Sequence, residues 1–207
     1  MVAKNTKIEN LFLTVTIGLI SPILMFVVGW WSAIPFVPEA QIKFFALGGL
    51  LAGTLVDVLF LKRWMRNSIT CPLILPALIY LFYSVGTFGF FMGVPVFNVL
   101  LGPLGGYYMG MRLREQGTEA AVGDRIAHRT SLFTAFVLFT ACSAALALAS
   151  LDQSLSANIQ GIFRLQTPLS RELIMGLSAA AGAVLVWIEY TVTRSVVRIG
   201  KFAVPES

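Results

Sequence analysis

Six apolar runs dominate the sequence, and each is long enough to cross the hydrocarbon core of a lipid bilayer as a helix. A core about 30 Å thick needs about 20 mostly apolar residues, at a helical rise of about 1.5 Å per residue. The runs cover about residues 11–31, 44–61, 72–92, 94–111, 131–151 and 173–193. They predict an all-α, polytopic integral membrane protein, folded as a six-helix transmembrane bundle.

The composition supports this class. Of the 207 residues, 57% are hydrophobic and 12% are charged, and the mean hydropathy is +0.82, all far from the values of soluble domains. Six spans use more than half of the chain, so we expect one transmembrane domain over residues 1–207. The net charge of +5 comes from basic residues at the ends of apolar runs, and this placement argues against a nucleic-acid surface.

The third and fourth runs form one apolar stretch, which Gly93 and Pro95 divide. With this division and a cytoplasmic N-terminus, 12 of the 15 basic residues are cytoplasmic, as the positive-inside rule favours, and only Lys43, Arg164 and Arg171 are external. The five-span alternative reverses the later helices and leaves 7 basic residues inside and 8 outside. We therefore predict a tight external hairpin at Gly93 and Pro95 in a multi-pass protein of the plasma or inner membrane, with both termini cytoplasmic.

Small residues recur at four-residue spacing on the second, fourth and sixth runs. They are Gly49 and Gly53, then Gly102, Gly106 and Gly110, and finally Ser178 and Gly182. This spacing lets helix backbones approach closely where lipid gives no hydrophobic drive for association. It predicts helix packing within the chain or contacts in a homo-oligomer or with a membrane partner. A functional groove along the same faces is the alternative. The pattern also fits three helical-hairpin repeats slightly better than two three-helix repeats.

Three polar residues continue these small-residue faces inside the predicted spans. Asp57, Glu189 and Asn98 each stand four or seven residues from one of the glycines, so we expect them to face the bundle interior. A carboxylate at the centre of a span costs about 2.5 to 3.5 kcal/mol and usually marks function. Both carboxylates lie near a predicted cytoplasmic end, so ion pairs with Arg63 or Arg194 are the structural alternative. For Asn98, the alternative is a hydrogen bond to a neighbouring helix.

A Gly-Pro step interrupts the fourth predicted span. Broken helices build the mid-membrane sites of many transporters, because freed carbonyls can line a wet cavity, although a simple packing kink is the alternative. Tyr107 is expected at the depth of Asp57, where its phenol can donate a hydrogen bond. We therefore expect a pathway for a substrate or ion lined by Asp57, Glu189, Asn98, Gly102, Pro103, Gly106 and Tyr107.

The sequence carries no motif for metal binding, cofactor binding or nucleophilic catalysis. His128 is the single histidine, and neither cysteine belongs to a Cys-x-x-Cys pair, so we expect no metal and no cofactor. Asp124 stands one helical turn before His128, but no placed Ser or Cys nucleophile accompanies the pair. The pair is therefore interpreted as a surface contact rather than a catalytic dyad.

These features favour a transporter or channel subunit for a small solute or ion over an enzyme. The alternatives are a membrane-embedded enzyme that acts on a lipid at the cytoplasmic interface, and a non-catalytic assembly or scaffold subunit. In the enzyme, Asp57 and Glu189 would serve as general acid and base. The expected partners are the lipid bilayer, a small solute or lipid, and further copies or another membrane protein, with no nucleic acid.

Overall fold

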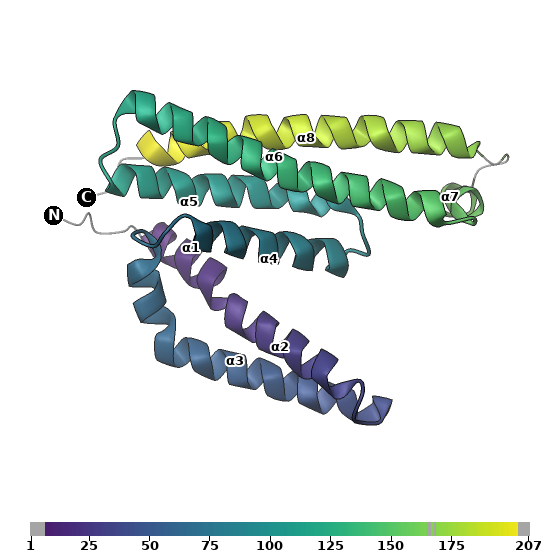
Figure 1. The fold of residues 1–207 in the computed structure, drawn as a ribbon, viewed down its shortest axis with the longest axis horizontal. Coiled ribbons are helices and arrows are strands. Elements are labelled where there is room, and N and C mark those ends of the chain that lie inside the picture. The colour runs from purple at the N-terminus through teal and green to yellow at the C-terminus, as the bar shows by residue number, and fades with distance from the viewer. Residues whose placement is uncertain (1–6, 165–166, 168, 203–207) are drawn as a thin grey trace. The chain divides into compact units, whose positions relative to one another are not determined.

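The computed structural model describes residues 7–164, 167 and 169–202, which form helices joined by turns and loops and contain no strand (Figure 1). Four helical segments are long and apolar enough to cross a membrane: Lys7–Ala33, Glu39–Ser68, Ala120–Leu151 and Arg171–Lys201. The all-α class is confirmed, and these helices fit a membrane protein. The count of six spans and their orientation stay predictions, because the helices of the third and fourth runs are shorter.

The chain divides into two compact units, which are described separately. Of the described residues, 7–75 form the N-terminal unit, and those from 76 to 202 form the C-terminal unit. The expectation of one transmembrane domain stays a prediction.

The N-terminal unit pairs the first and second apolar runs. Its helices are α1 (Lys7–Gly18), α2 (Ile20–Ala33) and α3 (Glu39–Ser68). Pro22 accounts for the break between α1 and α2, because proline has no N–H to bond the carbonyl of Gly18 four residues earlier. The helix α3 runs antiparallel to α2, and a β-carbon at Gly49 would clash with the carbonyl oxygen of Met25. The small residues of α3 therefore pack α2 and α3 backbone to backbone, as their spacing predicted.

The C-terminal unit holds the remaining elements. They are α4 (Ile74–Phe90), the 3₁₀ helix η1 (Pro95–Leu100), α5 (Leu101–Glu115), α6 (Ala120–Leu151), α7 (Leu155–Phe163) and α8 (Arg171–Phe202). The helix α6 runs antiparallel to α8, since Asp124 near its start contacts Arg198 and Ser150 near its end contacts Arg171. The helices α5 and α8 pack along each other in the same direction.

The chain reverses direction between α4 and η1. Met92 and Gly93 have positive φ angles of 54° and 81°, and the amide of Gly93 donates to the carbonyl of Phe88 at 2.8 Å, a bond that closes the end of α4. The Asn98 amide then reaches back to the carbonyl of Ser84 at 2.9 Å. The third and fourth apolar runs are thus two antiparallel segments, as the Gly93 and Pro95 hairpin predicted. Its external location stays a prediction.

The distribution of polar and apolar side chains in the C-terminal unit suits a lipid environment. Phe136 of α6 and Trp187 of α8 are each 67% exposed, whereas Thr193 and Glu189 of α8 are fully buried. A soluble helix bundle shows the opposite pattern, with apolar side chains inside. Outward apolar and inward polar side chains are expected where the surroundings are hydrocarbon.

Candidate functional site

The predicted site residues fall in both compact units. Asp57 belongs to the N-terminal unit, and the other six belong to the C-terminal unit. A continuous pathway from Asp57 to the others, and the expected bond between Asp57 and Tyr107, therefore stay predictions.

Asp57 lies on the face of α3 that packs against the break between α1 and α2. The residue is 7% exposed, and its Oδ1 has no hydrogen-bond partner among the described residues. A β-carbon at Gly18 would stand 3.8 Å from the Oδ2 atom. Within the described part of the chain, Asp57 forms no ion pair with Arg63. Its carboxylate is thus buried beside a helix break, with no ion pair to a described residue.

Glu189 is a buried carboxylate in the interior of the C-terminal unit. The residue is 0% exposed, and the hydroxyl of Tyr80 on α4 donates a hydrogen bond to Oε1 at 2.9 Å. Its Oε2 atom has no partner among the described residues. Arg194, the expected structural partner, contacts Asp124 instead at 3.4 Å. In the described part of the chain, one phenol therefore bonds the carboxylate and no cation forms an ion pair with it.

Gly102 gives this carboxylate its space. It is buried in the first turn of α5, and a β-carbon there would clash with both carboxylate oxygens of Glu189. The structure thus brings together two residues that the sequence analysis selected for separate reasons. The room that glycine leaves at this position is filled by the Glu189 side chain.

The other glycines of this face pack α5 against α8. A β-carbon at Gly106 would lie 2.9 Å from the carbonyl oxygen of Thr193, and one at Gly110 would lie 2.7 Å from that of Val197. These are backbone contacts, so they support the packing interpretation of the small residues. The glycine face of α5 is covered by α8 of the same chain.

Pro103 marks a change of helix type rather than a break within an α-helix. The 3₁₀ helix η1 ends at Leu100, and Pro103 is the third residue of α5. Proline is tolerated there, because the first turn of an α-helix has no intrahelical acceptors for its N–H groups. The expected interruption is present, but as a junction between η1 and α5 close to the Glu189 carboxylate.

Asn98 links η1 to α4. It is 2% exposed, and its side-chain amide donates to the carbonyl of Ser84 at 2.9 Å, the interhelical bond expected as its structural role. Its Oδ1 atom has no partner among the described residues. Asn98 therefore combines a packing contact with a free buried acceptor.

Sequence reasoning did not select Tyr80 or the buried threonines. Tyr80 and Ser84 stand four residues apart in an apolar run, and this spacing was an available sign of a shared polar face. Thr193 likewise stands four residues after Glu189, and the Thr134 hydroxyl donates to the Thr193 hydroxyl at 3.3 Å. Both threonines are at most 1% exposed. A threonine in an apolar run is a weak sign of a polar site, because its hydroxyl often bonds the backbone of its own helix.

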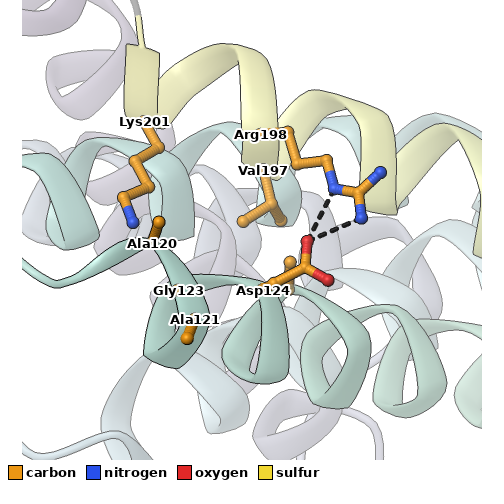
Figure 2. A pocket seen from close by; sticks show the side chains of 8 residues that line it. Ala120, Ala121, Gly123, Asp124, Val197, Arg198 and Lys201 are labelled. Carbon is orange, nitrogen blue, oxygen red and sulfur yellow. Dashed lines mark hydrogen bonds and ion pairs between the residues drawn. The ribbon is translucent and has the colours of Figure 1, made fainter.

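Charged side chains gather where α6 begins and α8 ends. Asp124 binds Arg198 through Oδ1 at 2.6 Å (Figure 2). Its Oδ2 atom lies 3.4 Å from Arg194. His128 approaches the hydroxyl of Tyr190 at 2.9 Å, so the side chains that meet Asp124 and His128 come from α8. In the described residues, no three His, Cys, Asp or Glu side chains cluster as a metal site requires.

A groove of about 350 Å³ opens beside these charges. Figure 2 shows Lys201 and Arg198 of α8 on one side and Ala120, Ala121 and Asp124 of α6 on the other. Val197 points between the two helices. The groove therefore joins an apolar interior to a charged rim.

Comparison of the chain with models of protein families, with curated proteins and with solved structures gave no match. The geometry around Glu189 therefore carries the functional interpretation.

Proposed function

We propose that this chain is a small membrane transport protein, or a subunit of one, which moves a small ion through its C-terminal unit with Glu189 as the binding group. One observation carries the proposal: among the described residues, a fully buried carboxylate receives a single hydrogen bond from Tyr80, has a free Oε2 atom and has no cation as a partner. Helix packing alone favours a neutral side chain, because a charge inside a membrane protein is expensive and usually functional.

Other buried acceptors support a pathway. Asn98 Oδ1 in the C-terminal unit and Asp57 Oδ1 in the N-terminal unit also lack partners among the described residues. Free oxygens are the groups that a proton or a small cation uses when it leaves water. Asn98, Gly102, Pro103, Gly106 and Tyr107 of the C-terminal unit are proposed to line the route together with Glu189. Asp57 is proposed as a separate ion-binding carboxylate of the N-terminal unit.

The proposed setting is a plasma or inner membrane that six spans cross, with both termini cytoplasmic. A bundle of only six spans encloses a narrow path, so a homo-oligomer or a membrane partner is part of the proposal. Because α8 covers the glycine face of α5, the contact between copies is expected on other small-residue or apolar faces.

Flux measurements in liposomes test the proposal. The purified full chain is reconstituted, and proton, Na⁺ and K⁺ fluxes are followed with ion-sensitive dyes. Glu189→Gln is expected to lower the flux of one of these ions about tenfold or more, a change of about 1.4 kcal/mol in the barrier. Glu172→Gln is the matched control, since Glu172 is exposed in the first turn of α8.

The alternatives predict different results. Absence of a Glu189-dependent flux for all three ions would contradict transport. Turnover of a phospholipid that depends on both Asp57 and Glu189 would instead identify an enzyme. A stoichiometric membrane partner that co-purifies equally with wild type and Glu189→Gln, in the absence of flux, would indicate a scaffold.

A further inference from the structure

A buried row of hydroxyl groups leads away from Glu189 between α6 and α8. Thr193 follows Glu189 by one turn of α8, and the Thr134 hydroxyl on α6 lies 3.3 Å from the Thr193 hydroxyl. Ser131 lies one turn earlier on α6 and bonds the carbonyl of Ala127 at 2.8 Å. The three hydroxyl residues are at most 1% exposed. We call Ser131, Thr134 and Thr193 the polar seam.

The polar seam ends one helical turn from the open groove. Ala127, four residues before Ser131, and Val197, four residues after Thr193, both line the groove. With Leu113 of α5, they form a small buried apolar cluster. A single apolar layer thus separates the polar seam from a groove with a charged rim.

From this arrangement we infer that the ion bound by Glu189 is a proton, and that it reaches the carboxylate from the groove through the polar seam. The inference rests on the proposed function and adds the identity of the ion and its side of entry. Val197 stands at the end of the route, and the Arg198 and Asp124 pair lies at its mouth.

The space around Glu189 favours a proton over a metal cation. A β-carbon at Gly102 would already clash with the carboxylate, so the two helices leave little volume there. Divalent cations in proteins take about six or more oxygen ligands, whereas a proton needs one free lone pair and almost no volume. Glu189 Oε2 offers that lone pair.

The titratable groups around Glu189 leave its charge uncompensated. Tyr80 approaches the carboxylate from α4, and α5 presents Gly102. Four further titratable side chains of α6 and α8 bond to one another: Asp124, His128, Tyr190 and Arg194. Protonation therefore removes a buried charge for which the described residues supply no cation.

The proposed step is a reversible proton transfer. A proton from the groove crosses the apolar layer at Val197 on a transient water molecule and passes along the seam, where each hydroxyl accepts one proton and donates its own. The Thr134 hydroxyl lies 3.2 Å from the backbone carbonyl of Ser131, and Glu189 Oε2 has no partner among the described residues, so water molecules complete the steps from Ser131 to Thr134 and from Thr193 to Oε2. The proton binds Oε2 of Glu189 and converts the carboxylate to a neutral carboxyl group, while Tyr80 keeps its bond to Oε1. Release of the proton regenerates the carboxylate, and no other bond forms or breaks.

Proton flux in liposomes loaded with a pH-sensitive dye tests the route. Thr193→Val and Thr134→Val remove one hydroxyl each and are expected to lower the flux about tenfold. Val197→Thr replaces a methyl group of the apolar layer with a hydroxyl and is expected to raise it. Thr140→Val is the matched control, because Thr140 is exposed on α6 and bonds the carbonyl of Phe136.

The outcomes separate this inference from the proposed function. Proton flux that needs Glu189 but is unchanged in both threonine variants and in Val197→Thr would overturn the route and leave the proposed function standing. A Glu189-dependent flux of Na⁺ or K⁺ without protons would overturn the assignment of the ion alone. Absence of any Glu189-dependent flux would overturn both. If the valine variants do not fold, Val197→Thr decides together with Val197→Thr/Glu189→Gln, because a leak through misfolded protein would not depend on Glu189, whereas the added flux along the route would be lost in the double variant.

Discussion

At the scale of single residues, the Glu189 carboxylate restricts which side chains can stand beside it. Tyr80 supplies its one hydrogen bond among the described residues, and Gly102 supplies its space. The hydrogen bond and the missing β-carbon act on the same group from α4 and α5. Substitutions at Tyr80 and Gly102 therefore alter the surroundings of the carboxyl group and leave residue 189 a glutamate.

Tyr80→Phe removes the phenol hydroxyl and leaves the buried carboxylate without a hydrogen bond. We expect this change to lower the free energy of unfolding in detergent by about 1–3 kcal/mol, the usual penalty for an orphaned buried polar group. In Tyr80→Phe/Glu189→Leu, both polar groups are gone, and the loss should be smaller than the sum of the single losses. Additive losses would mean that the two groups are not coupled. Tyr83→Phe on the same helix is the control.

Gly102→Ala places a methyl group against the Glu189 carboxyl group. The carboxyl group is the far end of a flexible side chain, so we expect it to move away from Tyr80, with a stability loss of about 1–3 kcal/mol. A carbodiimide that modifies protonated carboxyl groups in apolar surroundings should label Glu189 at a changed rate, measured by mass spectrometry. Gly89→Ala is the control, because nothing lies within 4 Å of a β-carbon there. Equal labelling in both variants would show that Gly102 does not position the carboxyl group.

At the scale of elements, the close contact of α5 and α8 depends on backbone approach. Gly106 and Gly110 meet carbonyl oxygens, which cannot rotate away as a side chain can. Gly102 therefore makes room for the Glu189 side chain, whereas Gly106 and Gly110 allow the backbones of α5 and α8 to pack closely. Changes at the later glycines are expected to move a whole helix.

Gly110→Ala should separate α5 from α8, because its β-carbon would lie 2.7 Å from the carbonyl oxygen of Val197. We expect a loss of about 1–3 kcal/mol in unfolding free energy, as for other overpacked interiors. Gly86→Ala on α4 meets nothing within 4 Å and should be neutral or stabilising by up to about 1 kcal/mol, the gain in helix propensity. Thermal unfolding in one detergent compares the two variants. A stable Gly110→Ala protein would show that α5 and α8 can shift apart freely.

The short helix α7 begins after an acidic residue outside the spans. The hydroxyl and the amide of Ser154 donate to Asp152 Oδ1 at 2.6 Å and 2.8 Å, and these bonds hold the pKa of Asp152 below its usual 3.8. A lowered pKa means that the carboxylate stabilises this turn above pH 3.8, and that the contribution is lost as the pH falls through the folded-state pKa.

This titration predicts that the start of α7 loosens in acid. A spin label at Ala157, in a chain whose natural cysteines are replaced, should become more mobile as the pH falls from 6 to well below 3.8, through the lowered pKa of Asp152. Asp152→Ala should show high mobility at both pH values, since it has no carboxylate to titrate. A mobility change of the same size in Asp152→Ala would assign the transition to another group.

At the scale of the whole molecule, helix length and charge determine which part of each helix can lie in the hydrocarbon core of a bilayer. The helix α6 has 32 residues, about 48 Å at 1.5 Å per residue, and so exceeds the bilayer core of about 30 Å. Its start carries Asp124, Arg125 and Arg129, and its end is apolar. The excess length therefore belongs at the charged start, in water or at the lipid headgroups.

Cysteine labelling tests the side on which each end of α6 lies. In a chain without natural cysteines, Glu119→Cys should be shielded from an impermeant maleimide in intact cells, and Ser154→Cys should react. Both positions are exposed, so the difference reports the membrane side rather than burial. The opposite pattern would place the charged stretch outside and would favour five spans. Labelling after permeabilisation is the control for reactivity.

The sequence by itself determined the helical class, the division of the apolar stretch at Gly93 and the inward direction of Asn98 and Glu189. Each depends on local spacing or on the free energy of placing side chains in lipid, so no partner has to be known. The position of Pro103 was also visible, but its effect depends on the 3₁₀ helix before it.

The tertiary structure alone decided which groups meet. Glu189 was compatible with Arg194 one turn away, yet Arg194 binds Asp124, and Tyr80, 109 positions earlier, bonds the carboxylate. The spacing of residues along one helix shows which of them share a face. Which residues of other helices contact that face depends on how closely the glycines of α5 let α8 approach its neighbours. The polar seam has the same origin, because Thr134 and Thr193 meet only when α6 and α8 pack antiparallel.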